Sequence, residues 1–411
     1  MIGAELTADE IAAVRERVRA RLDWDSAVTD PELRTLIEAE LFAVPRMGRM
    51  TSEERGAAVS RLFHSFRGLD ALQPLLEDPE VTEIMIVGHE RIFIEKSGRL
   101  QLAPLGFESR ERLEDLIQSI VGQVNRIVNE ASPIVDARLP DGSRVHVVLP
   151  PVALQGPTVT IRRFPARPLG MDDLVKLGAL EPEAAHLLRR LVRAKYNLFI
   201  SGGTGSGKTT FLNALAQWIP SDERVITIED AAELQIRGIP NLVSLETRNA
   251  NTEGKGRIGM RDLIRASLRM RPNRIIVGEV RGEEALDMLQ AMNTGHEGSL
   301  STGHSNTARD MLSRLETMVL GGSDLPVAVV RRQIASALDV IVHLSRYRDG
   351  SRRVVEISEV AGLRDGEVDL HPLYLREGGG ESGGGLRRAG ELRDCRKWDA
   401  AEPAGEEEDR R

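Results

Sequence analysis

The 411-residue chain contains a single cysteine, Cys395, which excludes an internal disulfide framework and a zinc site built from several cysteines. One thiol in a chain of this length is typical of a reducing compartment. The N-terminal stretch MIGAELTADE lacks the basic-then-apolar pattern of a secretion signal. No apolar run approaches the roughly 20 residues that a membrane-spanning helix needs. We therefore expect a cytoplasmic protein that reaches a membrane only through partners.

The scarcity of aromatic residues and the lack of a positive net charge both argue against nucleic acid as a binding partner. Aromatic residues make up 3% of the chain, which leaves few stacking platforms for single-stranded nucleic acid. The formal net charge is −8, which argues against non-specific nucleic-acid binding as the main activity. The hydrophobic fraction of 41% nevertheless supports a substantial core, and the length suffices for two or three domains of about 150 residues each.

Changes in periodicity predict two domains in the first half of the chain. Residues 1–67 contain three amphipathic helical patterns, each behind a helix-start signal, which predicts a small helical bundle. In residues 68–164, short alternating strands surround one helical pattern, so we expect an α+β domain with a largely antiparallel sheet. Residues 165–171 carry two prolines and a glycine and are expected to be a linker.

The second half predicts one larger domain and a tail. Residues 172–375 alternate apolar strands with helices, which predicts an α/β domain with a mostly parallel sheet. Residues 376–411 are glycine-rich and then densely charged, a composition that buries no core. We therefore expect a disordered tail, and expect that deleting residues 378–411 leaves activity intact.

The clearest chemical signal is SGGTGSGKTT, which begins at Ser201 and fits the phosphate-loop pattern G-x-x-x-x-G-K-[ST]. A buried strand precedes it and a helical pattern follows it, which is the context that gives this motif its meaning. Backbone N–H groups of such a loop surround phosphate oxygens, the lysine reaches the β- and γ-phosphates, and the hydroxyl after it holds Mg²⁺. The residues expected to bind Mg-ATP are Gly202, Gly203, Thr204, Gly205, Ser206, Gly207, Lys208, Thr209 and Thr210.

Carboxylates follow two other predicted strands. ITIED ends in the two carboxylates Glu229 and Asp230, and IIVGE ends in Glu279. Because acids at neighbouring strand tips face the metal and the attacking water in phosphate-loop ATPases, we expect Glu279 to orient or deprotonate that water. Glu229 and Glu279 are also candidate Mg²⁺ ligands beside Thr209. Gly278 occupies the position where many such enzymes carry an aspartate, so coordination would depend on these groups and on water.

TGHEGSLSTGHSNTARD contains two histidines without a third ligand or an H-E-x-x-H pattern, so they predict no metal site. His304 ends a predicted strand, where an imidazole would be able to sense or polarise the γ-phosphate.

The four segments GGTGSGKTT, ITIEDAAEL, IIVGEVRGEEA and TGHEGSLSTGHSNTARDMLSRLE occur in this order. They resemble the Walker A, Asp box, Walker B and His box of the secretion-superfamily traffic ATPases, which include pilus motors and the type II and type IV secretion ATPases. The resemblance covers roughly residues 68–373 and looks closest to the Tad (Flp) pilus assembly ATPases. The tetracysteine module usual in type II secretion relatives is absent, as is the C-terminal motif of retraction motors.

This resemblance implies a RecA-like P-loop core behind an N-terminal sensor-like domain, assembled as a homo-hexamer that acts on an inner-membrane platform protein. It makes Glu279 the Walker B acid, Glu229 the Asp-box acid and His304 the His-box residue. Arginines of the N-terminal domain are expected to reach the γ-phosphate, because the guanidinium fork pairs with phosphate oxygens. The candidate arginines are Arg138, Arg144, Arg162 and Arg163.

Two other functions remain open at this point. A nucleic-acid translocase or helicase would use a related core, although the charge and the scarce aromatics weigh against it. A small-molecule kinase would need an acceptor pocket and a lid, whereas this chain uses its extra length for a second domain and a bundle. Stimulation by DNA or RNA, or phosphoryl transfer to a metabolite, would distinguish them.

Overall fold

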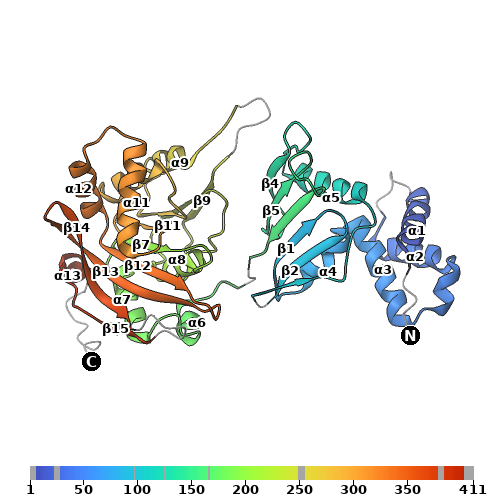
Figure 1. The fold of residues 1–411 in the computed structure, drawn as a ribbon, viewed down its shortest axis with the longest axis horizontal. Coiled ribbons are helices and arrows are strands. Elements are labelled where there is room, and N and C mark those ends of the chain that lie inside the picture. Colours follow the sequence, from blue (N-terminus) through green and yellow to red (C-terminus); the bar gives the residue numbers. More distant parts are fainter. Residues whose placement is uncertain are drawn as a thin grey trace. The chain divides into compact units, whose positions relative to one another are not determined.

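The computed structural model describes residues 6–22, 28–96, 98–124, 126–164, 167–248, 255–377 and 384–401. The chain divides into two compact units, Met1–Ala166 and Arg167–Arg411 (Figure 1). Residues 165 and 166 of the expected linker lie outside the described residues, as do residues 378–383 and 402–411 of the expected tail. None of the described helices combines the length and hydropathy that a bilayer crossing requires.

The first unit begins with three helices: α1 (Ala8–Arg21), α2 (Asp30–Phe42) and α3 (Ser52–Arg67). Thr7 and Thr51 cap α1 and α3 by accepting from the backbone N–H groups of Glu10 and Glu54. Apolar side chains on the inner faces of the helices form one cluster, which includes Val14, Val18, Leu33, Ile37, Leu41 and Leu62. Two 3₁₀ turns, Pro45–Arg49 and Asp70–Leu72, flank α3.

An antiparallel sheet follows, with the strand order β3-β2-β1-β6-β5-β4 in the described part of this unit. The strands are β1 (Val81–Val87), β2 (Arg91–Lys96), β3 (Arg99–Leu102), β4 (Ile134–Arg138), β5 (Arg144–Val148) and β6 (Thr158–Arg162). The short helix α4 (Gln73–Glu77) precedes β1. Alternate residues such as Ile84, Val145 and Ile161 are buried in one core with the apolar side of α5 (Arg110–Gln123). The other sheet face therefore carries the intervening, more polar residues.

The second unit is built on a sheet with the order β15-β14-β13-β12-β7-β11-β10-β8-β9 among its described strands. The strands from β12 to β9 run parallel. They are β7 (Leu198–Gly202), β8 (Val225–Glu229), β9 (Leu242–Glu246), β10 (Arg274–Val277), β11 (Leu300–His304) and β12 (Val340–Arg346). The antiparallel strands are β13 (Arg352–Arg364), β14 (Glu367–Arg376) and β15 (Leu386–Arg388).

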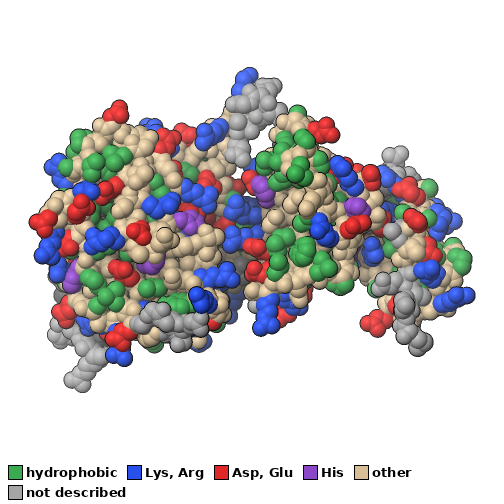
Figure 2. Space-filling model, viewed as in Figure 1, with side chains coloured by type: hydrophobic (Ala, Val, Ile, Leu, Met, Phe, Trp, Pro, Cys, Tyr) green, Lys and Arg blue, Asp and Glu red, His purple; other side chains and the backbone are tan. Residues whose placement is uncertain are grey.

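Helices cover both faces of this sheet (Figure 1). One face packs against α6 (Met171–Lys176), α7 (Pro182–Arg193) and α8 (Lys208–Ala216). The other packs against α9 (Met260–Ser267), α10 (Glu284–Met292), α11 (Ala308–Gly321) and α12 (Val327–Ala337). Acidic and basic side chains are interspersed over the outer surface of each unit on the face that Figure 2 shows.

The described part of the tail differs from the expectation of disorder. Residues 384–401 contain β15 and α13 (Arg396–Ala401), which pack on this unit. The buried Glu359 carboxylate accepts from the backbone N–H groups of Arg393 and Asp394 at 2.9 and 2.7 Å. Arg190 stacks on the Trp398 ring at 3.5 Å. Composition predicted no core here because the partners of this segment lie on distant strands and helices.

Candidate nucleotide site

The predicted phosphate loop lies at the carboxyl ends of the parallel strands, where ligands of open α/β sheets bind. It joins β7 to α8, so α8 presents its N-terminus to the loop. Gly207 precedes α8 with φ of 91°, a left-handed conformation that glycine adopts without a Cβ penalty. A Cβ on Gly202 would collide with the carbonyl oxygen of Leu344 on the neighbouring strand β12. The glycine spacing is therefore required by the loop's own geometry.

Lys208 is buried inside this loop. Its Nζ donates to the carbonyl oxygens of Gly202 and Gly203 at 3.1 and 2.9 Å. The same Nζ lies 3.3 Å from His304 Nδ1. Burial lowers the pKa of Lys208, while the nearby Glu279 opposes that shift. Thr209 and Thr210 occupy the first turn of α8, half-buried beside the lysine.

Glu279 and His304 meet because β11 lies between β7 and β10. His304 ends β11 in register with Gly202, and Glu279 follows β10. His304 Nε2 lies 2.8 Å from Glu279 Oε1, a buried oxygen that has no partner in hydrogen-bond geometry among the described residues. Burial lowers the pKa of His304, which favours the neutral imidazole. An unsatisfied carboxylate oxygen at this edge is suited to accept a proton from a water molecule.

Arg281 is a site residue that sequence reasoning missed. Its guanidinium donates to Glu279 Oε2 at 2.7 Å and lies 3.9 Å from the Asp230 carboxylate. The only signal was its position two residues after Glu279, which in a strand-to-helix loop does not fix a side chain's direction. His343, on β12, was also missed: its Nδ1 lies 2.9 Å from Ser201 Oγ beneath the loop.

Glu229 occupies a different environment from Glu279. Its Oε1 accepts from the backbone N–H groups of Glu233 and Leu234 at 2.9 and 3.0 Å. Burial raises the pKa of this carboxyl from 4.5 to about 7. The structure thus uses one oxygen of Glu229 to order the following loop. Its assignment as a metal ligand stays a prediction.

The residues present fit a magnesium nucleotide. The described residues contain no cluster of three or more acidic, histidine or cysteine side chains able to hold a metal ion. Mg²⁺ bound with nucleotides takes much of its coordination from phosphate oxygens and water, so Thr209 beside the phosphate loop is the candidate protein ligand for such an ion.

Three of the four candidate arginines share one row of the sheet in the first unit. Arg138 pairs in register with Arg144 across β4 and β5, and Arg144 with Arg162 across β5 and β6. Arg162 Nε lies 3.4 Å from the Glu83 carboxylate. Arg163 does not join this row, because its guanidinium donates to the backbone carbonyls of Asp78 and Val81.

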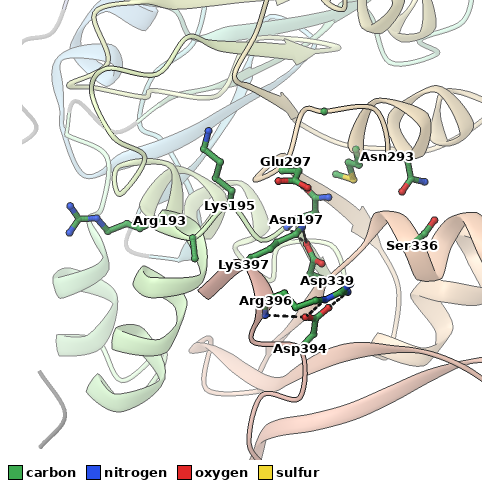
Figure 3. A pocket seen from close by; sticks show the side chains of 13 residues that line it. Arg193, Lys195, Asn197, Asn293, Glu297, Ser336, Asp339, Asp394, Arg396 and Lys397 are labelled. Carbon is green, nitrogen blue, oxygen red and sulfur yellow. Dashed lines mark hydrogen bonds and ion pairs between the residues drawn. The ribbon is translucent and has the colours of Figure 1, made fainter. Parts of the chain in front are cut away.

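A hollow of about 720 Å³ lies at the opposite end of the strands, before β7 and β12 begin (Figure 3). Asp339 there accepts from Lys397 Nζ at 2.7 Å, and Asp394 is paired with Arg396. It is the wrong edge for a ligand of a parallel sheet. The loop, and not this hollow, is therefore the candidate nucleotide site.

Comparisons with known proteins identify the family of this chain. Residues 67–367 match the family described as "Type II/IV secretion system protein". A putative conjugal transfer protein of Mycobacterium tuberculosis is 38% identical over 307 residues, covering 73% of this chain and 86% of the relative. The type IV secretion system protein VirB11 of Brucella suis is 33% identical over 332 residues, covering 74% and 91%.

A solved structure supports the fold. The Legionella pneumophila ATPase DotB is 23% identical with a TM-score of 0.51, covering 70% of this chain and 79% of that one. The chain thus belongs to the type II/IV secretion system protein family, the traffic ATPases that its four ordered motifs predict.

Proposed function

We propose that this protein is a cytoplasmic, hexameric motor that hydrolyses Mg-ATP to drive a Tad/Flp-type pilus or a related type II or type IV secretion machine at the inner membrane. The observation that supports it most directly is the convergence of Lys208, His304 and Glu279 at one edge of the parallel sheet. That arrangement suits transfer of a phosphoryl group to water.

Each residue has a role in this hydrolysis. Glu279, through its unsatisfied oxygen, orients and deprotonates the water that attacks the γ-phosphorus. The bond between the γ-phosphorus and the bridging oxygen breaks, giving ADP and phosphate. Lys208 neutralises the charge that spreads over the phosphate oxygens, and bound Mg²⁺ adds to that neutralisation. His304, next to both groups, reports whether the γ-phosphate is present.

The arginine row of the first unit completes the proposed chemistry. Arg138, Arg144 and Arg162 place three guanidinium groups on adjacent strands of one sheet face. Each guanidinium group can donate two hydrogen bonds to phosphate oxygens, so the row is suited to stabilise the negative charge that develops in the transition state. The resemblance to traffic ATPases supports the same role.

The test is to co-purify the full chain with inner-membrane proteins and to measure ATP hydrolysis with and without them. We expect a polytopic membrane protein that stimulates hydrolysis, and a six-fold assembly in light scattering with nucleotide bound. Stimulation by DNA or RNA in place of a membrane protein would instead favour a nucleic-acid translocase. Absence of ATP hydrolysis under all these conditions would refute the proposed activity.

A further inference from the structure

A rigid hairpin joins β12 to β13 beside the phosphate loop. Tyr347 N–H donates to Ser351 O at 2.8 Å, and Gly350 N–H donates to Tyr347 O at 3.0 Å. Gly350 has φ of 83°, the left-handed conformation that closes such a turn. The Asp349 carboxylate accepts from the N–H and the hydroxyl of Ser351 at 2.8 and 2.6 Å. The residues at the base of the hairpin are consequently held in fixed positions.

Arg346 and Arg352 face each other at this base as register partners. Like charges directly opposite one another destabilise an antiparallel pair. Neither arginine forms an ion pair with an acid in the part of the chain that the structure describes, so their repulsion is not offset by protein carboxylates. Such a pair is stabilised when an anion binds between or beside the two guanidinium groups.

Both arginines lie against the phosphate loop. Arg352 Nε donates to the carbonyl oxygen of Gly205 at 3.0 Å. A Cβ on Gly205 would lie 3.4 Å from Arg346 Nη1, and a Cβ on Gly207 would lie 3.3 Å from Arg352 Cδ. Arg346 ends β12 and Arg352 begins β13, whereas His304 ends β11 and Glu279 follows β10 on the other side of β7.

We propose that Arg346 and Arg352 form a second phosphate-binding arm of the nucleotide site, which binds the diphosphate portion shared by ADP and ATP. This inference rests on the proposed function, since it takes the loop to hold a nucleotide. Arg346 supplies a guanidinium to the phosphate oxygens. Arg352 is a positioning residue that also fixes the peptide between Gly205 and Ser206. Because the arm lies on the side of β7 away from Glu279, it determines affinity and not the rate of phosphoryl transfer.

The experiment compares the full-length wild type with Arg346→Ala, Arg352→Ala and Arg352→Lys. Arg364→Ala is the matched control, because it removes an exposed arginine from the other end of the same strand β13. Calorimetry gives the Kd for MgADP, and steady-state kinetics give kcat and KM for MgATP. Each alanine variant is expected to raise the ADP Kd and the ATP KM about tenfold, since one charge-assisted hydrogen bond contributes about that factor.

The remaining expectations distinguish a specific loss of phosphate binding from a general loss of folding or activity. All variants keep kcat within about twofold, and Arg364→Ala binds as the wild type does. Arg352→Lys stays weak, because an ammonium group does not reproduce the guanidinium fork. If Arg352→Ala unfolds at lower temperature, the exposed Arg346→Ala variant alone decides the question.

Unchanged ADP affinity in Arg346→Ala would overturn the inference, as would a large fall in kcat with unchanged KM. A wild-type protein that binds MgADP without hydrolysing ATP would refute the proposed function and leave this binding test intact. Pyrophosphate provides an independent probe: it should raise the Tm of the wild type more than that of Arg346→Ala, and equal shifts would count against the arm.

Discussion

Glu229 fills the space that a side chain at Gly278 would need: a Cβ there would lie 2.8 Å from Glu229 Cγ. The glycine that replaces an expected aspartate before Glu279 is thus explained by the neighbouring strand. With Gly278, the Glu229 carboxylate turns back to accept from the N–H groups of Glu233 and Leu234. The two acidic strand tips therefore differ in their contacts, since Glu279 Oε1 has no hydrogen-bond partner among the residues that the structure describes.

Gly278→Ala should displace Glu229 and unsettle the loop that it orders. We expect the free energy of unfolding to fall by about 1–3 kcal/mol, the cost of a strained contact in a packed core. ATP hydrolysis should fall with it, because Glu279 is the next residue. Gly122→Ala in α5 is the control, since a Cβ there meets nothing within 4 Å. Equal stability of the two variants in urea titrations would contradict this account.

Glu229→Gln should change how stability depends on pH. The folded protein holds the Glu229 proton more tightly than the unfolded chain, because burial raises its pKa from 4.5 to about 7. Ionisation therefore removes stability as the pH rises through this range, with no further change from this group above it. The glutamine variant should gain up to about 3 kcal/mol relative to wild type between pH 4.5 and 7.5. A constant difference in chemical denaturation would disprove the shift.

Lys208→Ala and Glu279→Gln should separate binding from chemistry. Lys208→Ala loses the charge that reaches the phosphates, so hydrolysis should be abolished. Glu279→Gln keeps the shape of the site but not the base, so ATP binding should persist while kcat falls at least about 100-fold. Fluorescent-nucleotide binding and phosphate release measure the two properties. Normal turnover in either variant would remove that residue from its role.

Arg144→Ala and Arg163→Ala should fail in different ways. Arg144 lies in the middle of the arginine row, so its loss should lower kcat at least about tenfold with little change in stability. Arg163 donates to the carbonyls of Asp78 and Val81, so its loss should cost about 1–3 kcal/mol of stability. Thermal unfolding and hydrolysis rates distinguish the two. The reverse pattern would show that Arg163 is the functional arginine.

Truncation at residue 384 should destabilise the second unit, contrary to the expectation from composition. It would leave the buried Glu359 carboxylate without the N–H groups of Arg393 and Asp394. Each lost partner of a buried group costs about 1–3 kcal/mol, so the loss of two should cost about 2–6 kcal/mol. Trp398→Ala, which removes the stacking on Arg190 and the packing of this ring against the core, should cost at least about 1 kcal/mol. An unchanged Tm after truncation would show that the segment contributes no stability.

Local sequence was sufficient for the phosphate loop, because its glycines, lysine and following helix are adjacent in the chain. It also placed Glu279 and His304 at strand ends, and parallel strands bring such ends to one edge. The alternation of apolar strand segments with helical segments likewise predicted the α/β domain that contains the strands from β7 to β11.

Contacts between distant segments were beyond this reasoning. Nothing in TIRRF shows that Arg162 lies in the arginine row while Arg163 turns to the Asp78 and Val81 carbonyls. The choice follows from strand register, which only the assembled sheet fixes. Similarly, a glycine-rich composition does not reveal that Glu359, some 34 residues earlier than Arg393, accepts a hydrogen bond from the backbone of the tail.

The shared register of Arg138 and Arg144 limits which insertions the chain tolerates. Their connection is tight: Leu139 N–H donates to Ser143 O at 2.9 Å, and Gly142 adopts φ of 92°. Adding one residue to this turn would slip β5 by one position and exchange its two faces. Val145 would then leave the core, and Arg144 would enter it. Length changes in residues 139–143 should therefore be tolerated far less than substitutions at the same positions.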